Sequence, residues 1–121
     1  MNLAECFEAM DGDYESVRQR IPKDEIIERF LKKFLADPCY DTLCKSWEDL
    51  NYPEAFRAAH SLKGVCYNLG LNGLGDSASV LTDYLREKNP EEIDRVQCEV
   101  LLQKVTSDYR KVIDGIRQLN S

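Results

Sequence analysis

Apolar residues recur along this chain at steps of three and four, which is the spacing that places side chains on one face of an α-helix. Four segments show this pattern: residues 23–50, 53–69, 72–88 and 102–119. In none of them do apolar and polar residues alternate at every second position, as they do in a half-buried strand. The pattern therefore predicts an all-α protein built on four main helical segments.

Helix-breaking residues separate these segments. Pro38 interrupts the first, which is therefore either one kinked helix or two short ones, with apolar positions continuing through Trp47 and Leu50. Residues 51–53 (NYP) break the chain before the second segment, and Gly70 is suited to end it in a left-handed conformation. Asn89-Pro-Glu-Glu at 89–92 is typical of a capped helix start and is expected to begin the last helix.

Short connections force successive helices to run in opposite directions. We therefore predict an antiparallel up-down four-helix bundle over residues 23–121. Residues 1–22, with the sequence DGD at 11–13, are expected to form a short N-terminal helical segment of one or two helices that packs on the bundle.

Composition fits a single globular domain. The chain has 121 residues, of which 43% are hydrophobic and 31% are charged. No stretch approaches the ~18 to 20 apolar residues that span a bilayer, and the acidic N-terminus lacks the basic region of a signal peptide. These features predict a cytoplasmic protein with no membrane partner. The net charge of −6 argues against nucleic-acid binding, which needs a cationic surface.

The cysteines do not form a recognisable framework. They are odd in number and scattered without a CxxC pair: Cys6, Cys39, Cys44, Cys66 and Cys98. One histidine cannot complete a zinc pattern with them. We expect reduced thiols that pack as small apolar side chains, with no disulfide and no metal site.

The only histidine, His60, points away from the predicted core. A helix turns by about 100° per residue, so the apolar positions Ala59, Leu62, Cys66 and Leu69 fall within about 40° of Ala55, whereas His60 lies about 140° from it. Lys63 lies at about 80° and Gly64 at about 180°. Singly, each is ordinary: a solvated histidine, a surface lysine and a tolerated glycine. Together they form a reactive imidazole with a cation nearby at Lys63 and, at Gly64, a neighbouring position without a side chain.

Aromatic residues flank this histidine on the same helix. Phe56 and Tyr67 lie at about 100° and 120° on the projection, and each could simply pack at the edge of the bundle. Exposed aromatic side chains on a polar surface also mark partner interfaces. We therefore take Phe56, Arg57, Ser61 and Tyr67 as candidate partner-docking residues. No serine or cysteine is placed to use His60 as a base, so the imidazole itself is the candidate nucleophile.

The sequence HSLKG at 60–64, followed by Leu69 and Gly70, resembles the motif of the histidine-containing phosphotransfer (HPt) domains of two-component phosphorelays. The resemblance covers about residues 23–119 and implies a four-helix bundle. It implies that His60 accepts a phosphoryl group at Nε2 and exchanges it with a receiver-domain aspartate, that Lys63 offsets the phosphoryl charge and that Gly64 leaves space for it. Val65 departs from the small residue that often follows the glycine; it projects away from His60, so we expect little effect.

The resemblance also implies partners and cofactors. The partners are receiver domains of response regulators or hybrid histidine kinases. The domain has no ATP site and no cofactor of its own, and Mg²⁺ is expected in the receiver. We therefore predict a stand-alone, monomeric phosphocarrier that is not an independent enzyme. Two alternatives stay open: a related bundle that only binds partners, and an oligomerising bundle whose last helix forms an intermolecular coiled coil.

Overall fold

The computed structural model describes residues 2–119, which fold into seven α-helices and one short 3₁₀ helix with no strand among them. In chain order the elements are α1 (Leu3–Ala9), α2 (Tyr14–Arg20), α3 (Asp24–Phe34), α4 (Cys39–Glu48), α5 (Tyr52–Asn68), α6 (Asn72–Leu85), η1 (Pro90–Glu92) and α7 (Arg95–Leu119). The predicted all-α fold is confirmed.

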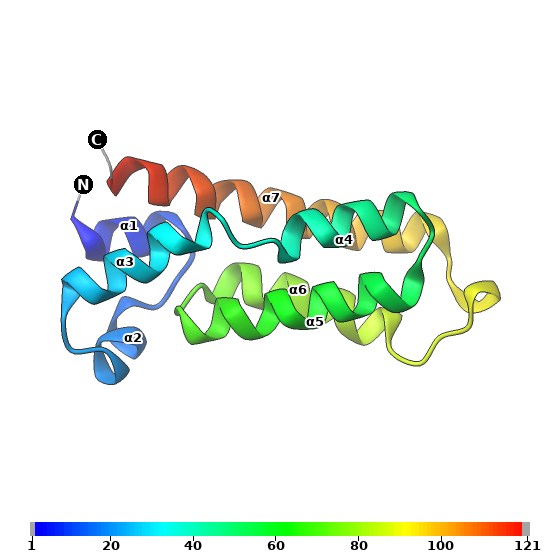
Figure 1. Cartoon of the computed structure of the whole chain (residues 1–121), viewed down its shortest axis with the longest axis horizontal. Helices are drawn as coiled ribbons and strands as arrows, with labels where there is room; N and C mark the ends of the chain where they lie inside the picture. The colour runs from blue at the N-terminus through cyan, green and yellow to red at the C-terminus, as the bar shows by residue number, and fades with distance from the viewer. Residues whose placement is uncertain (1, 120–121) are drawn as a thin grey trace.

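The long helices run side by side as an up-down bundle (Figure 1). Helices α3 and α4 follow one another along one edge, α5 returns beside α4, α6 runs back, and α7 passes along the whole length. The 25 residues of α7 span about 37 Å at 1.5 Å per residue, and this length lets α7 contact α1, α3 and α6. Helix α1 packs on α7.

Pro38 divides the first predicted segment into two helices. It stands at the N-cap of α4, where its missing N–H costs no hydrogen bond within the helix. The break leaves α3 and α4 attached to α7 through aromatic side chains. The rings of Tyr40 and Tyr109 stack with centroids 3.8 Å apart, and the Tyr40 hydroxyl donates to Thr106 Oγ1 at 2.9 Å. Phe34 packs against Tyr109 with centroids 6.0 Å apart.

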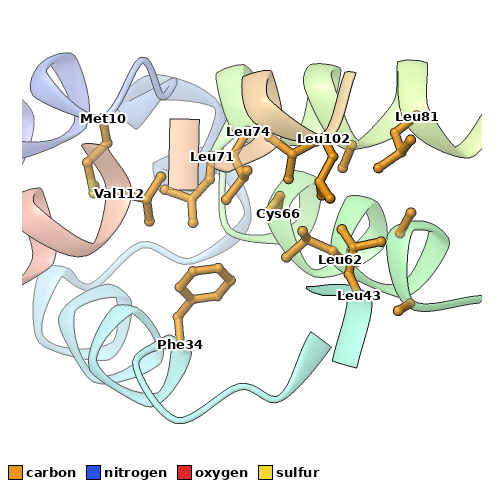
Figure 2. Packing of buried hydrophobic residues seen from close by; sticks show 14 of the residues in the cluster. Met10, Phe34, Leu43, Leu62, Cys66, Leu71, Leu74, Leu81, Leu102 and Val112 are labelled. Atoms are coloured by element: carbon orange, nitrogen blue, oxygen red, sulfur yellow. The ribbon is translucent and has the colours of Figure 1, made fainter. Parts of the chain in front are cut away.

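One apolar core fills the space between the helices. Figure 2 shows Leu62 and Cys66 of α5 pointing into the same interior as Leu74 of α6 and Leu102 of α7, while Phe34 enters from the end of α3. The apolar stripe of α7 is buried within this core, at Leu102, Val105, Val112 and Ile116. Because these side chains are buried within the bundle, they are not available to form an intermolecular coiled coil. The monomeric state stays a prediction.

The N-terminal helices contribute to the same core. Their buried side chains are Leu3, Cys6, Phe7, Met10 and Val17. The Cys6 thiol donates to the carbonyl of Gly115 at 3.1 Å, and Met10 occupies the space that a side chain at Gly115 would need. Helices α1 and α2 therefore fill volume between α7 and the α5–α6 connection, whereas a domain boundary at residue 22 stays a prediction.

All five cysteines lie within residues 2–119 and are free thiols. Burial is the first cause that raises the pKa of each of these thiols, and the pKa of Cys39 is raised to about 12. These thiols are therefore protonated at neutral pH.

Two expectations about helix ends were wrong. Leu50, which continues the apolar spacing, is 45% exposed because α4 ends at Glu48 and Leu50 adopts a left-handed φ of 56° that lets the Asn51 amide bond to the Ser46 carbonyl at 2.8 Å. The capped sequence at 89–92 forms only the single turn η1, because the chain then extends to bury Ile93. Helix α7 starts afterwards, with the Asp94 carboxylate accepting from the Val96 and Gln97 amides.

Gly70 is expected to be intolerant of substitution. Its φ is +70°, as predicted for a helix terminator, and an added Cβ would fall on a methyl group of Val17. Gly70→Ala should lower the free energy of unfolding by about 2–4 kcal/mol, combining the cost of a left-handed alanine with that of overpacking. The measurement is urea unfolding followed by circular dichroism.

The matched control is Gly64→Ala, at an exposed helical glycine where an added Cβ meets nothing within 4 Å. This variant should instead gain about 1 kcal/mol from helix propensity. Equal effects at the two glycines would show that the strain assigned to Gly70 is wrong.

Candidate functional site

Helix α5 is fixed at its start and buried along one face, which decides what its opposite face can present. The Asn51 side chain caps the helix by accepting from the Glu54 amide at 3.2 Å, and Pro53 occupies the first turn. The buried face consists of Tyr52, Ala55, Ala58, Ala59, Leu62 and Cys66. Because these residues pack against α4 and α6, the remaining face is directed to solvent.

His60 lies on this solvent-directed face, as the helical projection predicted. Its side chain is exposed, and Gly64, one turn further along, is exposed as well. Apart from its two chain neighbours and the backbone of the helix itself, a Cβ built at Gly64 would meet no atom of residues 2–119 within 4 Å, so the space beside the imidazole is open. The structure therefore places a histidine next to a cleared surface that another molecule can approach closely.

Phe56 stands beside His60 and extends this surface toward the start of α5. The two rings stack with centroids 6.0 Å apart and an interplanar angle of 30°. On Phe56 lies the guanidinium of Arg86, whose Cζ is 5.2 Å from the ring centroid. Arg86 follows the last residue of α6 and was not identified from the sequence. The antiparallel pairing of α5 and α6, which brings the start of one helix to the end of the other, was the feature that could have indicated it.

The cations of this surface differ in how their charge is compensated. Arg57 donates to Glu54 Oε2 at 2.6 and 3.0 Å, and Arg86 lies 3.6 Å from an oxygen of Asp83. Lys63 is half-buried, and among residues 2–119 no carboxylate oxygen lies within 4.0 Å of its ammonium. Lys63 is therefore the cation on α5 whose charge is available to an anion at His60.

Tyr67, near the C-terminal end of α5, connects the same surface to α6. Its hydroxyl donates to Asp76 Oδ1 at 2.6 Å, and its ring covers Gly75, where an added Cβ would lie 2.6 Å from a ring carbon. Burial, followed by the hydrogen bond to Asp76, raises the pKa of Tyr67 to about 12. The hydroxyl therefore stays protonated through neutral pH and remains a donor.

Ser61, the remaining docking candidate, is exposed but lies about 100° around the helix from His60. The structure thus gathers Phe56, His60, Lys63, Gly64 and Tyr67 along one side of α5, and it leaves Ser61 at the margin.

The His60 surface is open. A cavity of about 390 Å³ lies between α6 and α7, and its lining, which includes Val80, Leu101 and Asp108, contains neither His60 nor Lys63 nor Gly64. Within residues 2–119, no group of three or more His, Cys, Asp or Glu side chains is arranged to hold a metal ion. No helix in that range is long and apolar enough to cross a bilayer. The surface thus presents an exposed imidazole and an uncompensated cation, and the cavity between α6 and α7 lies apart from both.

Comparison with known proteins identifies the family. Neither the curated proteins nor the solved structures contain a significant match to the chain. A family model described as the Hpt domain matches residues 3–118, which is nearly the whole chain. Domains of this family are helical phosphocarrier modules that transfer phosphoryl groups through a histidine in phosphorelays, and they interact with receiver domains and kinases. The chain therefore belongs to the Hpt domain family.

Proposed function

We propose that this protein is a stand-alone histidine phosphotransfer protein in which His60 accepts a phosphoryl group from, and donates it to, an aspartate of a receiver domain. The observation that carries the proposal is the exposed imidazole of His60 beside the open space at Gly64. His60 is also the chain's only histidine, so no other residue can supply the imidazole that the family's chemistry requires.

The transfer step uses the lone pair of one imidazole nitrogen, which we assign to Nε2. This nitrogen attacks the phosphorus of an aspartyl phosphate while Nδ1 carries the proton. A nitrogen–phosphorus bond forms as the phosphorus–oxygen bond breaks, and the carboxylate leaves with the electron pair. The reverse step regenerates the neutral imidazole. Positioning and charge stabilisation supply most of the catalysis in phosphoryl transfer, so an open surface is sufficient once the partner has docked.

Lys63 and Gly64 have distinct roles in this step. Lys63 lies one turn from His60, and its uncompensated ammonium offsets the negative charge of the phosphoryl group. Gly64 leaves the approach free for the phosphoryl group and for the partner's backbone. Arg86, held over Phe56, brings a second positive charge to the edge of the same surface.

The partner completes the site. Phe56, Arg57, Ser61 and Tyr67 form the proposed docking surface around His60, and receiver domains of response regulators or hybrid histidine kinases are the proposed partners. The carrier has no ATP site in this proposal, and Mg²⁺ for transfer belongs to the receiver.

Whether the domain acts as a stand-alone protein is tested separately. The test is the size of the native polypeptide in a cell extract, measured on an immunoblot. The cytoplasmic location stays a prediction.

A binding-only role is the alternative function. A domain of this kind would dock partners through the same surface without carrying phosphate. Gly64 argues against it, because a helical glycine costs about 1 kcal/mol relative to alanine and no contact among residues 2–119 requires it.

His60→Gln is expected to abolish phosphate transfer completely, because the side-chain amide cannot replace the imidazole nucleophile. Purified protein is mixed with a phosphorylated receiver domain and Mg²⁺, and acid-labile phosphate is followed by intact mass. Wild type should gain one phosphoryl group and His60→Gln none. If several receivers fail to transfer to wild type while circular dichroism shows an intact fold, the binding-only role replaces the carrier.

Gly64→Gln is expected to stabilise the fold and impair function at once. Glutamine is a better helix former than glycine by roughly 0.5–1 kcal/mol, so the melting temperature should rise. Its side chain would occupy the space beside His60, and the rate of phosphate transfer should fall about tenfold or more because alignment is lost. The control is Ser107→Gln, which adds the same side chain at an exposed position on α7. Unchanged transfer by Gly64→Gln would contradict the clearance role of Gly64.

Lys63→Met is expected to slow transfer about two- to fivefold, since exposed charge pairs contribute about 0.2–1 kcal/mol. The effect should shrink at high salt, which screens the interaction. Lys45→Met removes an exposed lysine from α4, where it pairs only with Asp49, and should leave the transfer rate at the wild-type value. Equal rates for the two variants would remove Lys63 from the site.

A further inference from the structure

The C-terminal end of the histidine helix is capped by a residue from the N-terminal segment. Helix α5 has no basic residue in its own last turn. Arg20, the last residue of α2, donates through Nη2 to the carbonyl of Tyr67 at 3.2 Å and to that of Asn68 at 3.1 Å. Its Nη1 donates to Ser16 Oγ at 3.2 Å, which orients the guanidinium.

This arrangement satisfies a requirement of every helix end. The last carbonyls of an α-helix have no partner within the helix and carry the negative end of its dipole. The Asn68 carbonyl accepts from Arg20 and from no other donor within residues 2–119. The Arg20 guanidinium supplies the missing donor at Asn68, a second donor at Tyr67, whose carbonyl also accepts from the Gly70 amide, and the complementary charge. Arg20 therefore acts on α5 as a C-terminal cap contributed by another helix.

The N-terminal segment also forms backbone hydrogen bonds with the turn that follows α5. The Asp13 amide donates to the Gly70 carbonyl at 2.8 Å, and the Gly73 amide donates to the Asp11 carbonyl at 2.9 Å. Backbone contacts thus hold the turn, while Arg20 holds the helix end. The N-terminal segment therefore contacts α5 in two places: Arg20 binds the last carbonyls of the helix, and the backbone of residues 11–13 binds the turn that follows it.

Tyr67 connects the capped end of α5 to the proposed docking surface, because it belongs to both. Its carbonyl is held by Arg20, its ring lies on Gly75, and its hydroxyl is bonded to Asp76. The Tyr67 carbonyl also accepts from the Gly70 amide at 3.2 Å, so loss of Arg20 removes one of several restraints and weakens the last turn without releasing it. His60 lies seven residues earlier, about 10 Å along the helix, in a well-packed region.

We propose that Arg20 is a positioning residue for partner docking: by capping α5 from outside, it fixes Tyr67 in the orientation that a receiver domain contacts. The proposal rests on the phosphotransfer function proposed above. It assigns the N-terminal segment a part in partner binding and none in the chemical step at His60.

The test compares Arg20→Met, which keeps the aliphatic stem, with Arg20→Lys and Arg18→Met. Arg18 lies on the same helix, but its guanidinium pairs with Asp24 at 3.1 Å at the start of α3, so it is the matched control. Transfer rates are measured against the concentration of a phosphorylated receiver. Arg20→Met should raise the half-saturating concentration about two- to fivefold, the scale of an exposed cation at a helix C-terminus, with the maximal rate unchanged. Arg20→Lys should restore most of the loss, and Arg18→Met should match wild type.

A second measurement needs no receiver. Amide hydrogen exchange should accelerate in Arg20→Met at Leu69, Gly70 and Leu71, whose amides bond to carbonyls in the last turn of α5, and stay unchanged around His60. Unchanged exchange at these three amides would overturn the capping role even if wild type transferred no phosphate, so failure of this proposal and failure of the proposed function are distinguishable.

Three further outcomes would overturn the proposal. The first is a half-saturating concentration of Arg20→Met equal to that of wild type, measured with a receiver from which wild type takes up phosphate. The second is a lower maximal rate, which would place Arg20 in the chemical step. The third is an Arg20→Met protein that is unfolded at the assay temperature, which would assign Arg20 to global stability and not to local positioning.

Discussion

The burial of one face of α5 is the constraint on which the rest of the structure depends. Small side chains at Ala55 and Ala59 let α5 pack closely between its neighbours, and Leu62 and Cys66 continue the buried face. A helix fixed in this way has one direction left for a functional side chain. His60 takes that direction, so the packing that stabilises the bundle also keeps the imidazole in the open.

Features that depend on local spacing could be predicted from the sequence. The face of α5 follows from about 100° per residue, and the left-handed Gly70 follows from its place after the last apolar position. Such features need no knowledge of which helices touch. The exposure of His60 and Gly64, with Lys63 half-buried beside them, was predictable for the same reason, although the proposed roles of these residues await experiments.

Features that depend on tertiary contacts could not be predicted from the sequence. Leu50 fits the apolar spacing but lies beyond the helix, because a backbone hydrogen bond across the turn ends α4 earlier. The capping sequence at 89–92 forms a real cap, yet the burial of Ile93 limits it to one turn. Arg86 and Arg20 reach α5 from other helices, so no pattern within α5 indicates either of them.

One glycine on α5, Gly64, bears on the proposed carrier function. Where sequence and fold agree at every level, a residue that lowers helix stability without a packing reason points to function. Gly75 and Gly115 have packing reasons, because Tyr67 and Met10 occupy the space beside them. Gly64 has none, since nothing lies within 4 Å of an added Cβ. The cost of a glycine at this position has no packing explanation among residues 2–119, and the proposed carrier function supplies one, because the space beside His60 is then left for a phosphoryl group.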